Sequence, residues 1–155
     1  MPKNLIIYFS ATGITQEAAQ QLKQLINADL IQLEPVHGFS DDYESIVAWG
    51  KQQLDNQQHP QIKTKLPDLT TYQTVYIGFP TWWQQPPMII HSLFDEADFK
   101  DKTIVPFTTS MSTPLSDSLP YLRKMSKSSG ATLAGGFRYT NKNDLKNFLL
   151  KNSSY

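Results

Sequence analysis

Short apolar runs alternate along this chain with longer segments in which hydrophobic residues recur every three or four positions. The short runs predict strands at 5–9, 30–33, 75–79, 103–107 and 132–137. The longer segments predict helices at 13–26, 42–56, 88–97, 114–130 and 143–151. Because each strand is followed by a helix, the pattern favours an α/β fold: a five-stranded parallel sheet with helices on both faces.

Prolines constrain the later elements, because proline has no backbone N–H to donate. Pro106 fits poorly inside a central strand, so we expect it near the C-terminal end of strand 103–107. Pro114 suits the first position of a helix capped by Thr113, whereas Pro120 predicts a kink or a late start of that helix.

Composition narrows the class of function. Of the 155 residues, 39% are hydrophobic and 18% charged, so we expect a single globular domain over residues 1–155. Lys and Arg together number 14, as do Asp and Glu, and this balance lacks the basic excess of a dedicated nucleic-acid-binding protein. The chain has no cysteine, so any redox chemistry requires a bound cofactor.

The N-terminal residues lead directly into the first predicted strand, without the pattern of a signal peptide. No apolar run approaches the roughly 20 residues that span a bilayer. We therefore expect a cytoplasmic protein with no membrane partner.

The turn between the first strand and the first helix reads Ser10-Ala11-Thr12-Gly13-Ile14-Thr15. Such a turn directs backbone N–H groups and the positive end of the helix dipole to one point, which favours a phosphate there. Three hydroxyls add donors, and Gly13 lets a ligand approach the backbone. The alternative is a turn whose hydroxyls only cap the helix. The pattern S-x-T-G-x-T after a first strand resembles the phosphate loop of flavodoxin-like proteins, which bind flavin mononucleotide (FMN).

A second unusual turn reads Pro80-Thr81-Trp82-Trp83-Gln84-Gln85-Pro86-Pro87. Two adjacent tryptophans in a polar loop favour a flat ligand or a partner surface. An isoalloxazine ring is such a ligand: one indole can stack on it, and we expect the other to pack into the core. The stretch G-F-P-T-W-W resembles the flavin-ring loop of short flavodoxin-like proteins.

The third turn follows strand 103–107, and residues 103–110 resemble the fourth strand and third ligand loop of the same proteins. Two departures from the family pattern stand out. Residues 109–114 replace a glycine-rich loop, and Gln84 replaces a glycine. Met111 is expected to cover part of the ring or to narrow the site.

The three matches occur in the family's order and cover most of residues 4–137. The resemblance implies a flavodoxin-like three-layer sandwich with strand order 2-1-3-4-5, in which all three turns open on one crevice. It implies FMN as cofactor, with the phosphate on Ser10, Thr12, Gly13, Ile14 and Thr15. The ring would lie between two further groups of residues, namely Pro80, Thr81, Trp82, Trp83 and Gln84 on one side and Thr109, Ser110 and Met111 on the other.

The implied function is electron transfer, and two roles remain open. One is a carrier that docks on a redox partner protein. The other is a reductase that takes electrons from NAD(P)H and passes them to a small quinone or flavin-type acceptor. Zero net charge slightly favours the reductase, because carriers of this family tend to be strongly acidic. The chain is expected to be a monomer or a homodimer.

Two other classes of protein share parts of this pattern. A flavin-free binding module on the same fold is the alternative, given the altered third turn. A receiver domain is disfavoured because Ser10 and Pro80 stand where it needs carboxylates. His37, His59 and His91 are too scattered in sequence to indicate a metal site, and we expect His91 on a helix surface.

Overall fold

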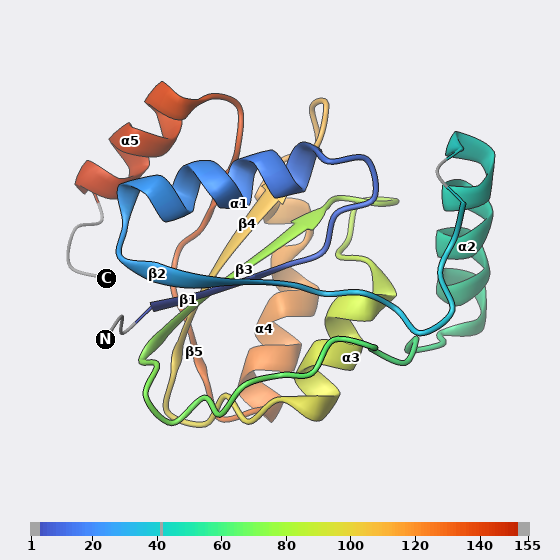
Figure 1. Cartoon of the computed structure of the whole chain (residues 1–155), viewed down its shortest axis with the longest axis horizontal. Coiled ribbons are helices and arrows are strands. Elements are labelled where there is room, and N and C mark those ends of the chain that lie inside the picture. The colour runs from blue at the N-terminus through green and yellow to red at the C-terminus, as the bar shows by residue number, and fades with distance from the viewer. Residues whose placement is uncertain (1–3, 41, 152–155) are drawn as a thin grey trace.

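The computed structural model describes residues 4–40 and 42–151 and is built around a parallel sheet (Figure 1). Its strands are β1 (Asn4–Tyr8), β2 (Ala28–Gln32), β3 (Thr74–Pro80), β4 (Thr103–Thr109), β5 (Thr132–Leu133) and β6 (Phe137–Arg138). The pairs between these strands are parallel, in the order β2-β1-β3-β4-β5. Strand β6 also pairs with β4, nearer the C-terminal end of β4 than β5 does. The predicted order 2-1-3-4-5 is therefore confirmed.

Helices cover both faces of this sheet, as predicted. They are α1 (Ile14–Leu25), α2 (Tyr43–Asn56), α3 (Met88–Glu96), α4 (Leu119–Ser128) and α5 (Lys142–Lys151). Figure 1 shows α1 and α5 on one face and α3 and α4 on the other, which gives the three layers. Among the described residues, no helix has the length and apolar character needed to cross a membrane.

Side-chain alternation along the strands divides the core between the two faces. On β1, Leu5 and Ile7 join one buried cluster, whereas Ile6 and Tyr8 join the other. The first cluster includes Leu93 of α3, and the second includes Leu22 of α1. Both faces of β1 are thus buried, as expected for a strand between two helical layers.

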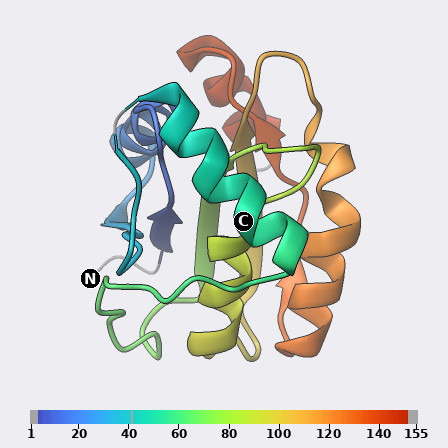
Figure 2. The same ribbon diagram turned by 90° about the vertical axis from the view of Figure 1, so that its right-hand side faces the viewer.

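Helix α2 occupies a different place from the other helices. It lies beyond the carboxyl ends of the strands, at the right of Figure 1 and in front in Figure 2. Trp49 anchors it: its indole stacks on Phe9 at 5.8 Å and lies 4.9 Å from the Phe39 ring, and its Nε1 donates to the His37 carbonyl at 2.9 Å. Asp42 caps the helix by accepting from the Ser45 N–H. The sequence favours Ser40 or Asp41 as the cap of this helix; the structure has Asp42 instead, and Asp41 lies outside the described residues.

The predicted fifth strand, 132–137, is divided into β5 and β6, and Pro106 explains the division. Pro106 was expected near the end of its strand but lies at the middle of β4, opposite Ile77 of β3. It has no N–H to offer a neighbouring strand on its other side. At Gly136 a Cβ would lie 1.9 Å from the Pro106 carbonyl oxygen, so only glycine fits beside it.

The predicted helix 114–130 begins later than its first proline. Pro114 precedes a short 3-10 helix, Leu115–Asp117, instead of starting an α-helix. Helix α4 then starts at Leu119, with Pro120 in its first turn, where a missing N–H costs nothing. Of the two outcomes allowed for Pro120, the late start is confirmed.

Candidate functional site

The three predicted turns meet at the carboxyl edge of the sheet. Thr15, at the start of α1, and Thr109, at the end of β4, join their buried hydroxyls at 2.7 Å. The Thr81 N–H donates to the Thr109 carbonyl at 2.9 Å, which ties the second turn to the third. The Thr81 and Thr108 hydroxyls are also hydrogen-bonded. Thr109 therefore holds residues of all three turns together.

The first turn is shaped as an anion site. Gly13 has φ = +96°, in the left-handed region, and its N–H donates to Ser10 Oγ at 3.0 Å. Within the described part of the chain, the backbone N–H groups of Ile14, Thr15 and Gln16 meet no protein acceptor. These groups open the N-terminus of α1, where the helix dipole also favours negative charge.

A cavity of about 280 Å³ lies between the three turns, and we call it the three-loop cavity. It brings together eight of the predicted site residues and one further residue, Tyr139; the eight are Thr12, Ile14, Pro80, Thr81, Trp82, Thr109, Ser110 and Met111. Its volume is close to the lower end of the range of small-molecule sites, about 300–1,000 Å³. Ser10, Gly13 and Thr15 shape the turn beside it but do not line it.

Two functional residues were not predicted from the sequence: Arg138, at the end of β6, and Tyr139, directly after it. Burial raises the pKa of Tyr139, and the charge of Glu17 raises it further, so its hydroxyl stays protonated and able to donate at neutral pH. Arg138 Nη1 donates to the carbonyls of Ser110 and Met111 at 3.3 and 3.4 Å. The topology could have indicated these two residues, because the carboxyl end of the fifth strand lies at the same edge of the sheet as the three turns.

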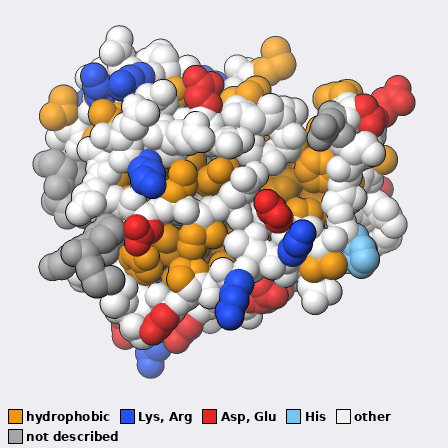
Figure 3. Space-filling view, in the orientation of Figure 1, with side chains coloured by type: hydrophobic (Ala, Val, Ile, Leu, Met, Phe, Trp, Pro, Cys, Tyr) orange, Lys and Arg blue, Asp and Glu red, His pale blue; other side chains and the backbone are white. Residues whose placement is uncertain are grey.

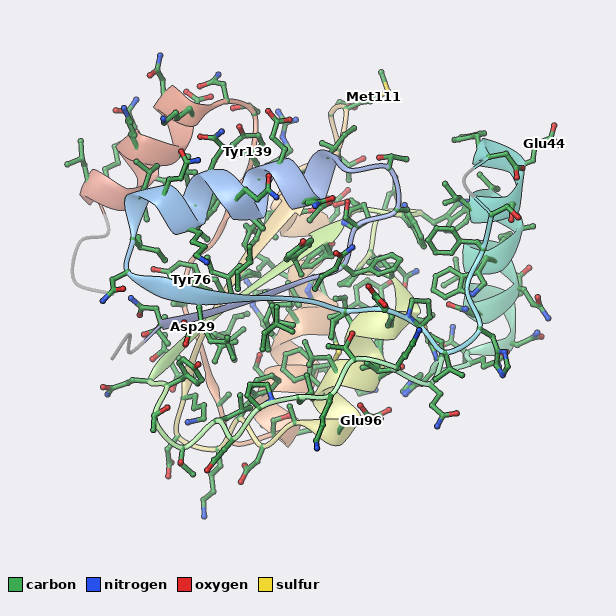
Figure 4. The ribbon with its side chains drawn as sticks, viewed as in Figure 1. Asp29, Glu44, Tyr76, Glu96, Met111 and Tyr139 are labelled. Carbon is green, nitrogen blue, oxygen red and sulfur yellow. The ribbon has the colours of Figure 1, made fainter. Side chains whose placement is uncertain are left out.

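The third turn carries Met111 at its tip. The Met111 side chain is fully exposed and points away from the sheet, as Figure 4 shows. Ser110 Oγ donates to the Thr113 carbonyl at 2.5 Å, which closes the base of the turn. In this arrangement Met111 borders the mouth of the three-loop cavity instead of filling it.

The tryptophan turn is closed by two hydrogen bonds between Trp82 and Gln85, one in each direction. Its central residues, Trp83 and Gln84, have φ values of +51° and +66°. Two residues with positive φ define a type I′ turn, which normally uses Asn and Gly. Holding bulky residues there costs free energy, and such strain is concentrated at ligand sites.

One of the two indoles packs toward the core, as expected, and the other is exposed. Trp82 packs edge-on against Phe9 and Trp49, with ring centroids 5.6 and 6.2 Å apart. Trp83 is 42% exposed. Both approach Gly50 of α2, where a Cβ would lie 3.0 Å from Trp82 and 3.2 Å from Trp83, so a larger residue would require the two indoles to shift by a few tenths of an ångström.

A second cavity, of about 310 Å³, lies between the tryptophan turn and α2, and we call it the α2 cavity. Its lining residues are Ala11, Thr12, Tyr43, Ile46, Val47, Pro80, Thr81, Trp82 and Trp83. The apolar spacing of helix 42–56 predicts Tyr43 on the inner face, together with Ile46 and Val47. In the structure Tyr43 is 77% exposed at the edge of this cavity. Trp83 lines the α2 cavity and not the three-loop cavity; Gln84 lines neither.

His91 lies on a helix, α3, as expected, but not on its exposed surface. Its ring is half-buried on α3 and lies 5.2 Å from the His59 ring, and its Nε2 is buried without a partner among the described residues. Burial lowers the pKa of His91, with smaller contributions from His59 and Lys124 that outweigh the opposing effect of Asp95. No group of three metal-binding side chains occurs in the described residues.

The site fits FMN in its chemistry. The open N–H groups of α1 suit a phosphate, although no lysine or arginine stands in the turn to neutralise its charge. The three-loop cavity offers an aromatic side chain, Trp82, together with the hydroxyl residues Thr12 and Thr81. Such a mixture suits a largely apolar ring with polar atoms on its edges.

Comparison with known proteins identifies the family. A family model described as flavodoxin matches residues 3–150. No curated protein sequence matches the chain. Among solved structures, a candidate flavoprotein from Bacteroides eggerthii has a TM-score of 0.86 and 28% identity, with 99% of each chain covered. A candidate flavoprotein from Bacteroides uniformis has a TM-score of 0.81 and 28% identity, with 96% of this chain and 98% of that chain covered.

A third structure, a flavoprotein in complex with FMN from Lactobacillus acidophilus, has a TM-score of 0.79 and 22% identity. It covers 95% of this chain and 98% of that chain, and at this identity it shows the shared fold. Since the family model covers nearly the whole sequence and the strand order agrees, the chain belongs to the flavodoxin family.

Proposed function

We propose that this protein binds FMN and transfers electrons through it. The observation that carries the proposal is the three-loop cavity, which adjoins the open N–H groups at the start of α1. The fold it shares with the FMN complex of the Lactobacillus flavoprotein supports the choice of flavin. Bound FMN supplies the electron chemistry, and the protein supplies binding and orientation.

Each part of the site has a role in this proposal. The N–H groups of residues 14–16 hold the phosphate, and Gly13 allows its close approach. Trp82 borders one side of the ring, and Thr109 and Ser110 border the other. Tyr139, which also lines this cavity, offers a protonated hydroxyl that can donate a hydrogen bond to the flavin.

The test is reconstitution of the purified protein with FMN, followed by visible absorption spectroscopy. Binding is expected to shift the flavin bands from those of free FMN, and denaturation is expected to release FMN. A colourless protein that cannot be reconstituted would overturn the proposal and favour the flavin-free binding module.

Within this function, we favour a reductase that passes electrons from NAD(P)H to a small acceptor. The uncharged, open α2 cavity beside the proposed flavin site supports this choice, because a carrier needs only an exposed ring edge. The test mixes the FMN-loaded protein with NADH or NADPH and a quinone, without any added reductase. Turnover supports the reductase, and its absence supports the carrier that docks on a redox partner protein.

A further inference from the structure

The α2 cavity is separate from the proposed flavin site but shares a wall with it. Both cavities are lined by Thr12, Pro80, Thr81 and Trp82. The remaining lining of the α2 cavity comes from α2 and from Ala11 and Trp83. A molecule in this cavity would therefore lie next to a flavin in the three-loop cavity, beside the shared residues of the first and second turns.

The chemistry of the lining selects the kind of ligand. None of the side chains that line the α2 cavity is charged, so a charged ligand would lose hydration without gaining an ion pair. Ile46 and Val47 form an apolar floor, and Figure 3 shows hydrophobic side chains gathered beside α2. Thr12 and Tyr43 add hydroxyls that can donate to a carbonyl oxygen. The lining suits an uncharged, flat molecule with carbonyl groups.

Two aromatic residues, Tyr43 and Trp83, line the edge of the cavity. Tyr43 exposes 77% of its surface, so its ring is free to contact a ligand in the cavity. Trp83 is held at φ = +51°, and Lys51 Nζ lies 5.7 Å from its ring centroid. The strained turn thus presents an indole to the cavity at a cost in folding free energy. Glu44, one residue after Tyr43, points into solvent, as Figure 4 shows.

We infer that the α2 cavity is a second binding site, which takes an uncharged quinone-type electron acceptor beside the flavin. The identification of the occupant as an acceptor rests on the proposed function, whereas the site itself does not. Reduction of a quinone to its hydroquinone takes two electrons, which the reduced flavin supplies, and two protons from water. Thr81 and Trp82 of the second turn lie beside both ligands.

The experiment measures binding of menadione, an uncharged naphthoquinone, by quenching of tryptophan fluorescence in the apoprotein and in the FMN-loaded protein. The chain has no cysteine, so thiol addition cannot imitate binding. The test variant is Val47→Phe, which fills the α2 cavity. Its matched control is Ala48→Phe, which adds the same ring to the exposed neighbouring position. Thermal melts test whether both variants fold. If Val47→Phe does not fold, Tyr43→Ala serves as the test variant, and Tyr121→Ala on α4 is its control.

Val47→Phe is expected to weaken menadione binding about tenfold or more, because the added ring occupies the ligand's space. Ala48→Phe should bind menadione like the wild type, and both variants should keep the wild-type affinity for FMN. A sulfonated naphthoquinone should bind more weakly than menadione.

Three results would overturn the inference: equal menadione affinity in Val47→Phe and wild type, displacement of menadione by FMN, or equal affinity for the sulfonated quinone. Failure of FMN binding in the wild type would instead refute the proposed function, and the apoprotein titration would still decide whether the second site exists.

Discussion

Thr15 Oγ1 and Thr109 Oγ1 lie 2.7 Å apart, although 94 residues separate them in the sequence. Both side chains are buried, so each hydroxyl depends on the other for its hydrogen bond. This contact joins the first and third ligand turns at the edge of the sheet. It makes the geometry of the site part of the stability of the fold.

Substitution of Thr109 by Val tests this contact. The change leaves the Thr15 hydroxyl buried without its partner, so the free energy of unfolding should fall by about 1–3 kcal/mol. The double variant Thr15→Val/Thr109→Val should recover part of that loss, because neither polar group is then stranded. Urea unfolding of the wild type, both single variants and the double variant measures the coupling, and additive losses would show that the two hydroxyls act independently.

Gly13→Ala tests the left-handed turn before α1. No atom lies within 4 Å of the Cβ that would be added, so only the φ of +96° opposes alanine. The expected loss of stability is about 1–2 kcal/mol, with weaker FMN binding, because the N–H groups of α1 are re-oriented. Gly38→Ala is the control, since its Cβ would make an ordinary contact 3.6 Å from Pro35. Equal stability of the two variants would remove Gly13 from this role.

Two neighbouring glutamines should respond to glycine with opposite signs. Gln84 has φ = +66°, so Gln84→Gly relieves strain and is expected to stabilise the protein by several tenths to about 1 kcal/mol. Gln85 has no positive φ, so Gln85→Gly only adds freedom to the unfolded chain and should destabilise. Thermal melts of the two variants provide the comparison. A loss of stability in both would mean that the turn is not strained.

His91 predicts the pH dependence of stability. Its pKa is lowered by burial in the folded state, so the unfolded state binds the proton more readily as the pH falls below about 6.5. Stability is therefore full above that pH and is lost as the pH falls toward the folded-state pKa, by at most about 1.4 kcal/mol per pH unit for one group. His91→Gln should flatten this part of the curve in urea unfolding. An unchanged slope of the unfolding free energy against pH would show that another group causes the pH dependence.

The sequence predicted the sheet and the meeting of the three turns because both follow from rules of local pattern. Continuous apolar runs identified β1, β3 and β4, and the carboxyl ends of parallel strands necessarily share one edge. The split of the fifth strand was missed, although Gly135-Gly136 inside it was a signal for a bulge or a close backbone approach. The partner in that approach, Pro106, is a non-local contact that no local pattern contains.

The sequence predicted the residues of α2 but not where the helix packs. Its apolar spacing showed that one side is buried but not what buries it. Trp49 and Gly50 in fact pack on Phe9 at the end of the first strand and on the indoles of the second turn. For that reason Tyr43 was placed inward, although it lies at the edge of the α2 cavity. His91 was placed on the surface because its contact with His59 joins segments far apart in sequence.

The most direct measurement of the central claim is a pair of calorimetric titrations, one with FMN and one with riboflavin. The two ligands share the ring and differ in the phosphate, so the difference isolates the contribution of the turn at residues 10–15. We predict FMN binding at least about 100-fold tighter, equivalent to about 2.7 kcal/mol. Equal affinities for the two ligands, or no binding of either, would contradict the account.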